Sequence, residues 1–134
     1  MVGTFVILQL SSIRRLRDEA DNEWLVIAIE ALFCLAMLLW FLVCRSDPGY
    51  LTRDESLNFT WLLETCEASS LCPDCQLVRT PTSRHCSLCN KCVDGLDHHC
   101  PWVNNCIGRG NFTAFYTFLN VQLLYLVTAV IVSA

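Results

Sequence analysis

The chain has 134 residues, 54% of them hydrophobic, and its mean hydropathy of +0.42 points toward lipid. The net charge of -4 and the scattered basic residues exclude a nucleic-acid partner, because no stripe of Lys and Arg could neutralise a row of phosphates. Ten cysteines would suit a disulfide-rich secreted protein, but seven of them are mixed with all three histidines between Cys72 and Cys106, which favours metal binding.

The first segment, residues 1–23, does not have the pattern of an export signal. Met1–Leu10 is apolar, but three arginines follow the apolar run instead of preceding it (Arg14, Arg15 and Arg17). We expect this segment to be the remnant of an earlier helix and loop.

Two long apolar stretches predict membrane-spanning helices. Residues 24–43 contain a single charge, Glu30, and residues 112–134 contain none. At about 1.5 Å of rise per residue, a helix of either length spans roughly the 30 Å of a bilayer core. The alternative, two buried helices of a soluble protein, fits less well because both stretches exceed the usual length of a core helix. The lipid bilayer is therefore an expected partner.

Between these stretches lies a polar segment, residues 44–111, which begins with a helix stop. Asp47-Pro48-Gly49 ends the first helix, because proline lacks a backbone donor and glycine permits φ > 0. The segment holds six Lys and Arg residues against three in the N-terminal segment, which favours a cytosolic loop. Its thiol-rich composition also suits a reducing compartment.

The polar segment carries ten side chains that could bind zinc, whereas two tetrahedral sites need only eight. They are Cys72, Cys75, His85, Cys86, Cys89, Cys92, His98, His99, Cys100 and Cys106. A Cys-x2-Cys pair can place two sulfurs about 2.3 Å from one ion. Cys72 with Cys75, and Cys86 with Cys89, therefore each predict half of a site.

Chain geometry suggests which of the other six are spare. In an extended strand, neighbouring side chains point to opposite faces, so His98 and Cys100 share one face and His99 lies on the other. We therefore expect His99 to bind metal and His98 to face Cys100. Asp97 precedes His98 and would orient it.

The predicted spare set has the composition of a cysteine-nucleophile site, with Asp97 as orienting carboxylate, His98 as base and Cys100 as nucleophile. A free thiol with a pKa of about 8.5 is mostly protonated at neutral pH, and a neighbouring histidine lowers that pKa. Zinc bound on either side would hold the thiol in position. A catalytic zinc is less consistent with the pattern, because four protein ligands for each ion leave no open position for water.

Ligand counting alone leaves two alternatives open. Cys100 could bind zinc, with Cys106 or Cys92 spare. Asp97 could instead hydrogen-bond a zinc-bound imidazole, which would move the ligand role to His98.

The run Asp97-His98-His99-Cys100-Pro101-Trp102, followed by Asn105-Cys106, Gly108 and Asn111, resembles the DHHC-type protein S-acyltransferases, or palmitoyltransferases. The resemblance extends back through the cysteine pairs to Asp47-Pro48-Gly49 and covers roughly residues 24–134. It implies a membrane protein whose transmembrane helices flank a small cytosolic cysteine-rich domain with two zinc sites and little regular secondary structure.

The resemblance also implies the ligand sets and the reaction. The first structural zinc ion would be bound by Cys72, Cys75, His85 and Cys92, and the second by Cys86, Cys89, His99 and Cys106. Asp97 and His98 would activate Cys100, which takes a long-chain acyl group from acyl-CoA, usually palmitoyl-CoA, and passes it to cysteines of protein substrates. The expected location is a Golgi or endoplasmic reticulum membrane, with several spans and the zinc domain facing the cytosol.

One face of the second helix carries a stripe at helical spacing, formed by Phe115, Phe118, Gln122 and Tyr125. Together with Trp102, these residues resemble the positions that line the acyl cavity of the family. An ordinary helix-packing stripe is the alternative.

Three departures from the family pattern bear on activity. The proline that usually follows a basic residue stands one position later, at Pro81, which leaves contacts to the CoA phosphates undefined. The family has four or more membrane helices, whereas this sequence shows two clear ones. The Thr-Thr-x-Glu motif that follows the last helix in the family is also absent. We therefore interpret the chain as a fragment, whose acyl cavity could be incomplete.

Two other classes of function fit the same residues. A catalytically inactive, membrane-anchored zinc scaffold predicts two bound zinc ions and no acyl adduct. A redox or metal-handling protein predicts exchangeable zinc that is lost under mild oxidation.

Overall fold

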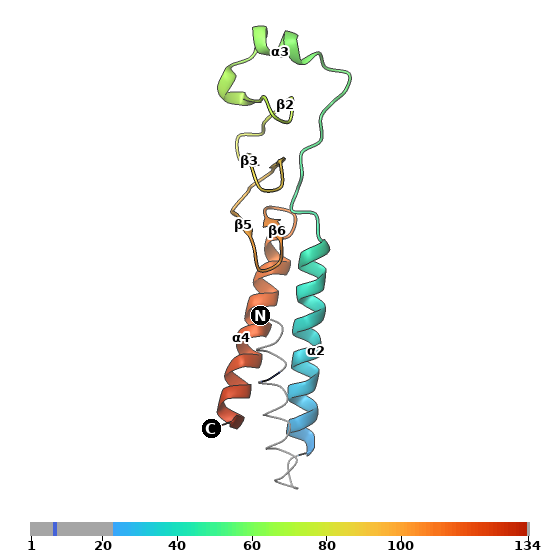
Figure 1. Ribbon diagram of the computed structural model, residues 1–134, viewed down its shortest axis with the longest axis vertical. Coiled ribbons are helices and arrows are strands. Elements are labelled where there is room, and N and C mark those ends of the chain that lie inside the picture. The colour runs from blue at the N-terminus through green and yellow to red at the C-terminus, as the bar shows by residue number, and fades with distance from the viewer. Residues whose placement is uncertain (1–6, 8–22, 134) are drawn as a thin grey trace. The chain divides into compact units, whose positions relative to one another are not determined.

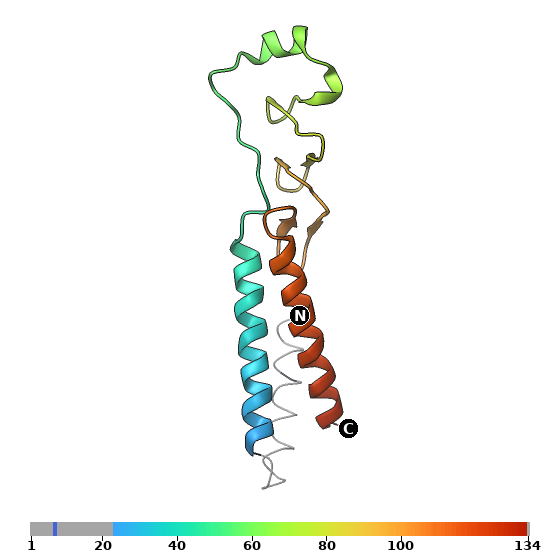
Figure 2. The same ribbon diagram turned by 180° about the vertical axis from the view of Figure 1, so that it is seen from behind.

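The computed structural model describes residues 7 and 23–133 (Figures 1 and 2). The prediction that residues 1–23 are the remnant of an earlier helix and loop lies almost wholly outside this range. The chain divides into two compact units, one formed by Met1–Phe41 with Tyr116–Ala134 and the other by Leu42–Phe115.

Two long apolar helices supply the described part of the first unit, namely α2 (Glu23–Arg45) and α4 (Phe112–Ser133). Both are long and apolar enough to cross a membrane, over Trp24–Arg45 and Phe112–Ile131. Only 17% of each span is buried within the structure, whereas the core helices of a soluble protein are mostly buried. Most of their apolar surface is therefore available to lipid.

The two helices lie side by side and contact each other through a small buried cluster (Figures 1 and 2). The cluster consists of Val26, Ile29, Tyr125 and Ala129. The rings of Phe33 and Tyr125 add a tilted contact, with centroids 5.6 Å apart. A single narrow stripe on each helix is thus used for helix packing.

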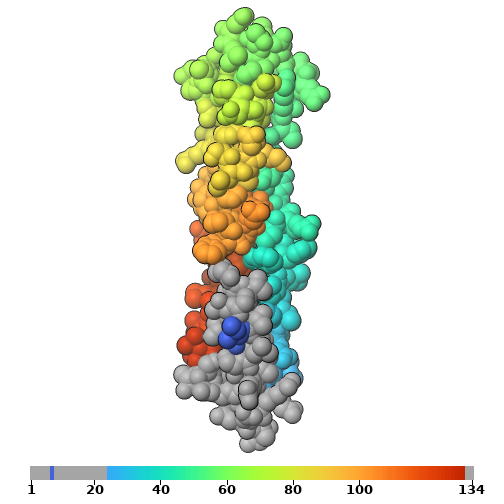
Figure 3. All heavy atoms as spheres, in the orientation of Figure 1, coloured from blue at the N-terminus to red at the C-terminus, as the bar shows by residue number. Residues whose placement is uncertain are grey.

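The second unit contains little regular structure beyond three short antiparallel hairpins. A short helix, α3 (Phe59–Thr65), and a 3-10 turn, η1 (Ala68–Ser70), precede them. The first hairpin pairs β1 (Leu71–Cys72) with β2 (Leu77–Val78), the second pairs β3 (Arg84–Cys86) with β4 (Lys91–Val93), and the third pairs β5 (His98–Cys100) with β6 (Asn105–Ile107). Within the unit the hairpins follow one another in chain order, from yellow-green to orange in Figures 1 and 3.

The three hairpins are copies of one another at a spacing of fourteen residues. Each turn contains one residue in the left-handed region, at Gln76 (φ 51°), Asn90 (φ 50°) and Asn104 (φ 48°). No other non-glycine residue in the described part of the chain has a positive φ. The same tight turn is therefore built three times.

The Asp47-Pro48-Gly49 motif connects the end of α2 to these hairpins. The Asp47 carboxylate accepts hydrogen bonds from the backbone N–H groups of Gly49 (2.8 Å) and Tyr50 (2.9 Å), which closes the turn after the helix. The backbone carbonyls of Pro48 and Gly49 then accept bonds from the N–H groups of Gly110 (3.1 Å) and Asp94 (2.8 Å). The turn is thereby tied to the loops that follow β4 and β6.

Two glycines allow this close approach. A Cβ atom on Gly108 would lie 2.5 Å from the carbonyl oxygen of Pro48, and one on Gly110 would lie 2.5 Å from that of Asp47. Both distances are shorter than any tolerated contact, so only glycine fits at these positions.

Candidate functional site

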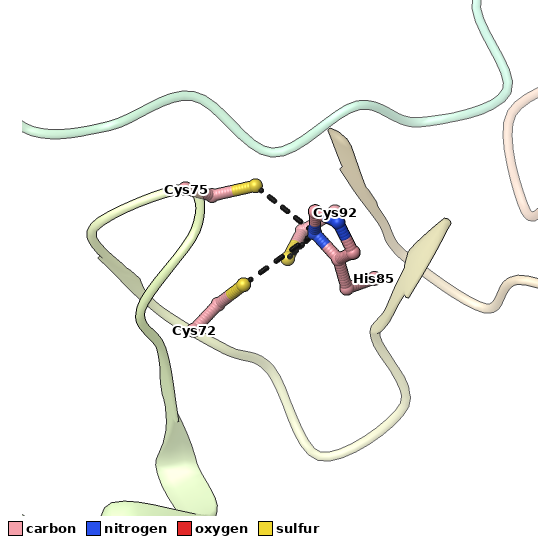
Figure 4. A group of neighbouring side chains, drawn as sticks. All are labelled: Cys72, Cys75, His85 and Cys92. Carbon is pink, nitrogen blue, oxygen red and sulfur yellow. Dashed lines mark hydrogen bonds between the residues drawn. The ribbon is translucent and has the colours of Figure 1, made fainter. Parts of the chain in front are cut away.

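The first Cys–His cluster is formed by two hairpins. Cys72 ends the first strand of the first hairpin, Cys75 lies in its turn, and His85 and Cys92 come from the strands of the second (Figure 4). The Nδ1 atom of His85 lies 3.5 Å from the sulfur of Cys72, 3.3 Å from that of Cys75 and 3.9 Å from that of Cys92. All four donor atoms lie within 4.8 Å of one another.

The second cluster repeats the arrangement one hairpin further along the chain. Cys86 ends the first strand of the second hairpin, Cys89 lies in its turn, and His99 and Cys106 come from the strands of the third. The Nδ1 atom of His99 lies 3.8 Å from the sulfur of Cys86, 3.3 Å from that of Cys89 and 3.7 Å from that of Cys106. In both clusters the histidine is separated from the three cysteines by 13, 10 and 7 residues.

The donor set fits a tetrahedral zinc ion. With Zn–S near 2.3 Å and Zn–N near 2.0 Å, a tetrahedron places sulfur and nitrogen roughly 3.6 Å apart, within the range seen in both clusters. Burial, and then the neighbouring thiols, raises the pKa of Cys92 and of Cys106. A divalent cation would offset this and hold these groups as thiolates, so the two clusters can hold metal ions.

Asp97, His98 and Cys100 lie at the third hairpin but outside both clusters. In the strand register His99 is opposite Cys106, whereas His98 and Cys100 are opposite Ile107 and Asn105. Because side chains alternate along a strand, His98 and Cys100 leave β5 on the face opposite His99. The structure thus brings the predicted ligands together and leaves the predicted base and nucleophile on the other face.

The imidazole of His98 is held by two contacts. Its Nδ1 atom lies 2.9 Å from a carboxylate oxygen of Asp97, and its ring makes an edge contact with Phe115, with centroids 5.6 Å apart. A carboxylate at Nδ1 favours the tautomer with the proton on that nitrogen, which leaves Nε2 free to accept a proton. Cys100 itself is only 4% exposed.

An asparagine that the ligand count did not single out anchors the third hairpin, which carries Cys100. The side-chain amide of Asn105, which pairs with Cys100, donates to the carbonyl oxygens of Val43 (3.0 Å) and Ser46 (2.8 Å) at the end of α2. Its side-chain oxygen accepts a bond from the hydroxyl of Tyr50 (3.3 Å). Asn105 therefore binds backbone carbonyls at the end of α2 and just beyond it.

A second asparagine reinforces this connection. Asn111 is 1% exposed, and its amide donates to the hydroxyl of Ser46 (3.0 Å) and to the carbonyl of Cys106 (2.9 Å). Its oxygen accepts from the N–H of Gly108 (3.0 Å). A buried asparagine with every group bonded fixes the backbone around it.

The residues expected at the acyl chain are placed in different surroundings. Trp102 is 64% exposed, Phe115 is buried against His98, and Phe118 is half-buried. Tyr125 is fully buried in the helix-packing cluster, which matches the packing alternative for that residue. Gln122 lies half-buried on the same stripe. The acyl-chain role of Trp102, Phe115, Phe118 and Tyr125 stays a prediction.

Comparison with known proteins agrees with the geometry. The family model described as DHHC palmitoyltransferase matches residues 65–134, which is more than half of the chain. The chain is 39% identical over 92 residues to the palmitoyltransferase ZDHHC4 of Bos taurus, covering 66% of this chain and 27% of the relative. It is 47% identical over 78 residues to the palmitoyltransferase ZDHHC14 of Danio rerio, covering 55% of this chain and 14% of the relative.

A third relative matches over fewer residues at a higher identity. The palmitoyltransferase SWF1 of Saccharomyces cerevisiae is 56% identical over 48 residues, covering 36% of this chain and 14% of the relative. The chain thus spans about a quarter or less of the length of these relatives. Because the family model covers more than half of its residues, the chain belongs to the DHHC palmitoyltransferase family.

Proposed function

We propose that this chain carries the catalytic centre of a protein S-acyltransferase, which moves a long-chain acyl group, typically palmitoyl, from acyl-CoA through a Cys100 thioester to protein cysteines. The observation that carries the proposal is the Asp97–His98 hydrogen bond on the strand that presents Cys100, outside both Cys–His clusters. A base and a thiol on one face, with the base oriented by a carboxylate, is the arrangement of an activated cysteine.

The proposed reaction consists of two thioester exchanges. His98 accepts the proton of the Cys100 thiol at Nε2, while Asp97 holds the proton at Nδ1. The thiolate attacks the thioester carbonyl carbon of acyl-CoA, the bond from that carbon to the CoA sulfur breaks, and His98 returns the proton to the departing sulfur. In the second exchange a substrate cysteine gives its proton to His98 and attacks the carbonyl carbon of the Cys100 thioester. The bond from that carbon to the Cys100 sulfur breaks, His98 returns the proton to this sulfur, and the acyl group stays on the substrate cysteine.

We assign one structural zinc ion to each cluster. Four protein donors for each ion leave no coordination position for water or substrate, so a bound ion would supply a cross-link and no catalytic step. His99 and Cys106 would fix β5 and β6 on one face and thereby orient His98 and Cys100 on the other.

The remaining assignments concern the membrane. The two candidate spans would place the hairpins at a bilayer surface, with the polar unit in the cytosol of a Golgi or endoplasmic reticulum membrane. An acyl chain attached to Cys100 would lie in lipid or beside Trp102, Phe115, Phe118 and Tyr125. Protein substrates would present cysteines close to the same surface.

The test is acyl-enzyme formation by the protein reconstituted in lipid vesicles. Labelled palmitoyl-CoA should give a covalent adduct that hydroxylamine removes. Cys100→Ala should abolish the adduct, and Cys66→Ala, which removes a thiol outside both clusters, should keep it. Label that persists in Cys100→Ala would assign the nucleophile elsewhere, and a wild-type protein with two zinc ions but no adduct would contradict the proposed activity.

A further inference from the structure

The nucleophile occupies a position that the other two hairpins use for a metal ligand. The first strand of each hairpin ends in a buried cysteine, at Cys72, Cys86 and Cys100, which are 3%, 6% and 4% exposed. In each hairpin this cysteine is the last paired residue before the turn, opposite Leu77, Lys91 and Asn105. Each turn then places its left-handed residue four positions later. We call the Cys-x2-Cys pair at the turn of a hairpin a zinc knuckle. By backbone position, Cys100 corresponds to the first cysteine of such a pair.

The three hairpins differ in the second position of the knuckle. Three residues after the first cysteine stand Cys75 in the first hairpin and Cys89 in the second, and both belong to a metal cluster. The third hairpin has Val103 there, and its side chain is 2% exposed. Valine offers no lone pair to a metal, so the knuckle of the third hairpin is left with a single thiol.

The ligands that would complete a third cluster are also missing. At the spacing of the first two clusters, an imidazole and a thiol would be needed at positions 113 and 120, which are Thr113 and Asn120. Both lie within α4, where no further hairpin follows. Only the Cys-x2-Cys pair could therefore recruit a metal ion at this end of the array, and Val103 removes one half of that pair.

We propose that Val103 is a specificity-determining residue that keeps Cys100 out of metal coordination. The inference rests on the proposed function, since it explains how a thiol in a zinc-ligand position stays available as a nucleophile. A thiolate bound to zinc shares a lone pair and much of its negative charge with the ion, so it attacks a thioester more slowly than a free thiolate. The buried isopropyl group fills the place of the second knuckle thiol and denies the ion its second donor.

The experiment restores the missing thiol by Val103→Cys in the full chain, reconstituted in vesicles with a phosphine reductant that prevents a disulfide. Cadmium serves as the probe, because it is a soft ion whose thiolate bonds absorb in the ultraviolet. We expect Val103→Cys to bind one additional cadmium ion, and to lose acyl-enzyme formation at a cadmium concentration at least about tenfold lower than wild type, with recovery on chelation.

Two matched variants isolate the cause. Val103→Ala removes the same side chain without adding a donor, and should show wild-type cadmium binding and sensitivity. Val103→Cys combined with Cys100→Ala has the new thiol without its partner, and should lose the additional absorbance. Retention of the two resident ions in every variant shows that the hairpins are intact. If Val103→Cys displaces the two resident ions, Val103→His replaces it in the experiment, with an imidazole nitrogen as the second donor beside Cys100.

A variant with a second donor that binds no more cadmium than Val103→Ala would overturn the inference. So would equal cadmium sensitivity of wild type and Val103→Cys. The absorbance titration does not depend on catalysis, so it remains informative if the wild-type protein forms no acyl adduct. In that case the proposed function fails, while the titration still reports whether Val103 blocks a metal half-site.

Discussion

The two Cys–His clusters have the same donors at the same separations, yet only one of them adjoins Cys100, the proposed nucleophile. The first is completed by β3 and β4, and the second by β5 and β6. The strands that complete the second cluster carry His98 and Cys100 on their opposite face. In the proposed function, a metal ion in the first cluster would only stabilise the fold, whereas a metal ion in the second would also position His98 and Cys100.

The comparison also explains what holds the second unit together. Its two small buried clusters are made largely of the metal-binding cysteines, with Leu77 in one and Val93 in the other. So little apolar burial cannot offset the chain entropy of about seventy residues. Structural zinc contributes on the order of 10–16 kcal/mol in small metal-dependent domains, so metal binding would dominate the stability of this unit.

The largest effects are expected from removing one ligand of each cluster. Cys106→Ser should lower the zinc content from two ions to one and abolish acyl-enzyme formation, because β6 loses its metal anchor beside Cys100. Cys92→Ser should cost the same one ion but reduce acylation less, by roughly 10–100-fold, because the second cluster remains. Zinc analysis and acylation rates measure both. Equal loss of activity in the two variants would show that the clusters act as one cooperative unit, and would contradict the different roles proposed for them.

The proposed role of His98, on the face opposite the second cluster, is tested by replacing its imidazole. His98→Gln should slow acyl-enzyme formation by about 10²–10³-fold while both zinc ions stay bound, because general-base assistance is lost and the ligands are untouched. Loss of zinc in His98→Gln would instead identify His98 as a ligand, the alternative that counting left open.

A smaller effect is expected where the third hairpin meets the end of α2. Asn105→Asp keeps the side-chain shape but turns a donor to two carbonyls into an acceptor that repels them, and each lost hydrogen bond contributes about 1 kcal/mol. We expect acylation to fall by about tenfold with two zinc ions retained. Asn104→Asp, an identical change at the exposed neighbour, should have little effect. Alkylation of Cys100 by iodoacetamide should stay near the wild-type rate if Asn105 acts by positioning.

The smallest effect is expected at the glycine that lets the turn after α2 approach the hairpins. Gly108→Ala would place a methyl group 2.5 Å from the Pro48 carbonyl and 2.7 Å from a methyl group of Val93. Relief of such a clash costs about 1–3 kcal/mol, so the melting temperature should fall by several degrees with zinc content unchanged. An unaltered melting temperature would show that the turn can move away from the hairpins without loss.

Much of this arrangement could be predicted from the sequence, for local reasons. Length and composition were enough for the two candidate spans, and the Cys-x2-Cys spacing was enough for half of each cluster. The alternation of side chains along a strand was enough to predict that His99 lies on one face and that His98 and Cys100 lie on the other. These features depend only on neighbours within a few residues.

The contacts of Asn105 and Asn111 could not be predicted in this way. They join positions about sixty residues apart, and nothing in the local pattern indicates that Val43 and Ser46 would be their partners. The repeat of the hairpins, by contrast, was available in the spacing of Cys72, Cys86 and Cys100. It was missed because Gln76 is an unusual residue for a left-handed turn, which hides the first copy.

Three hairpins that form two Cys–His clusters between neighbours leave one unused half-site at each end. At the first end the strand positions of the imidazole and thiol are filled by Leu71 and Val78, and neither side chain offers a donor to a metal ion. At the other end Cys100 keeps its thiol. A further hairpin in the same register would bring one imidazole and one thiol beside Cys100, and a metal ion bound by these three donors would hold the Cys100 sulfur as a ligand. In the proposed function, the last hairpin of such an array is therefore the place where a cysteine in a ligand position can serve as the nucleophile.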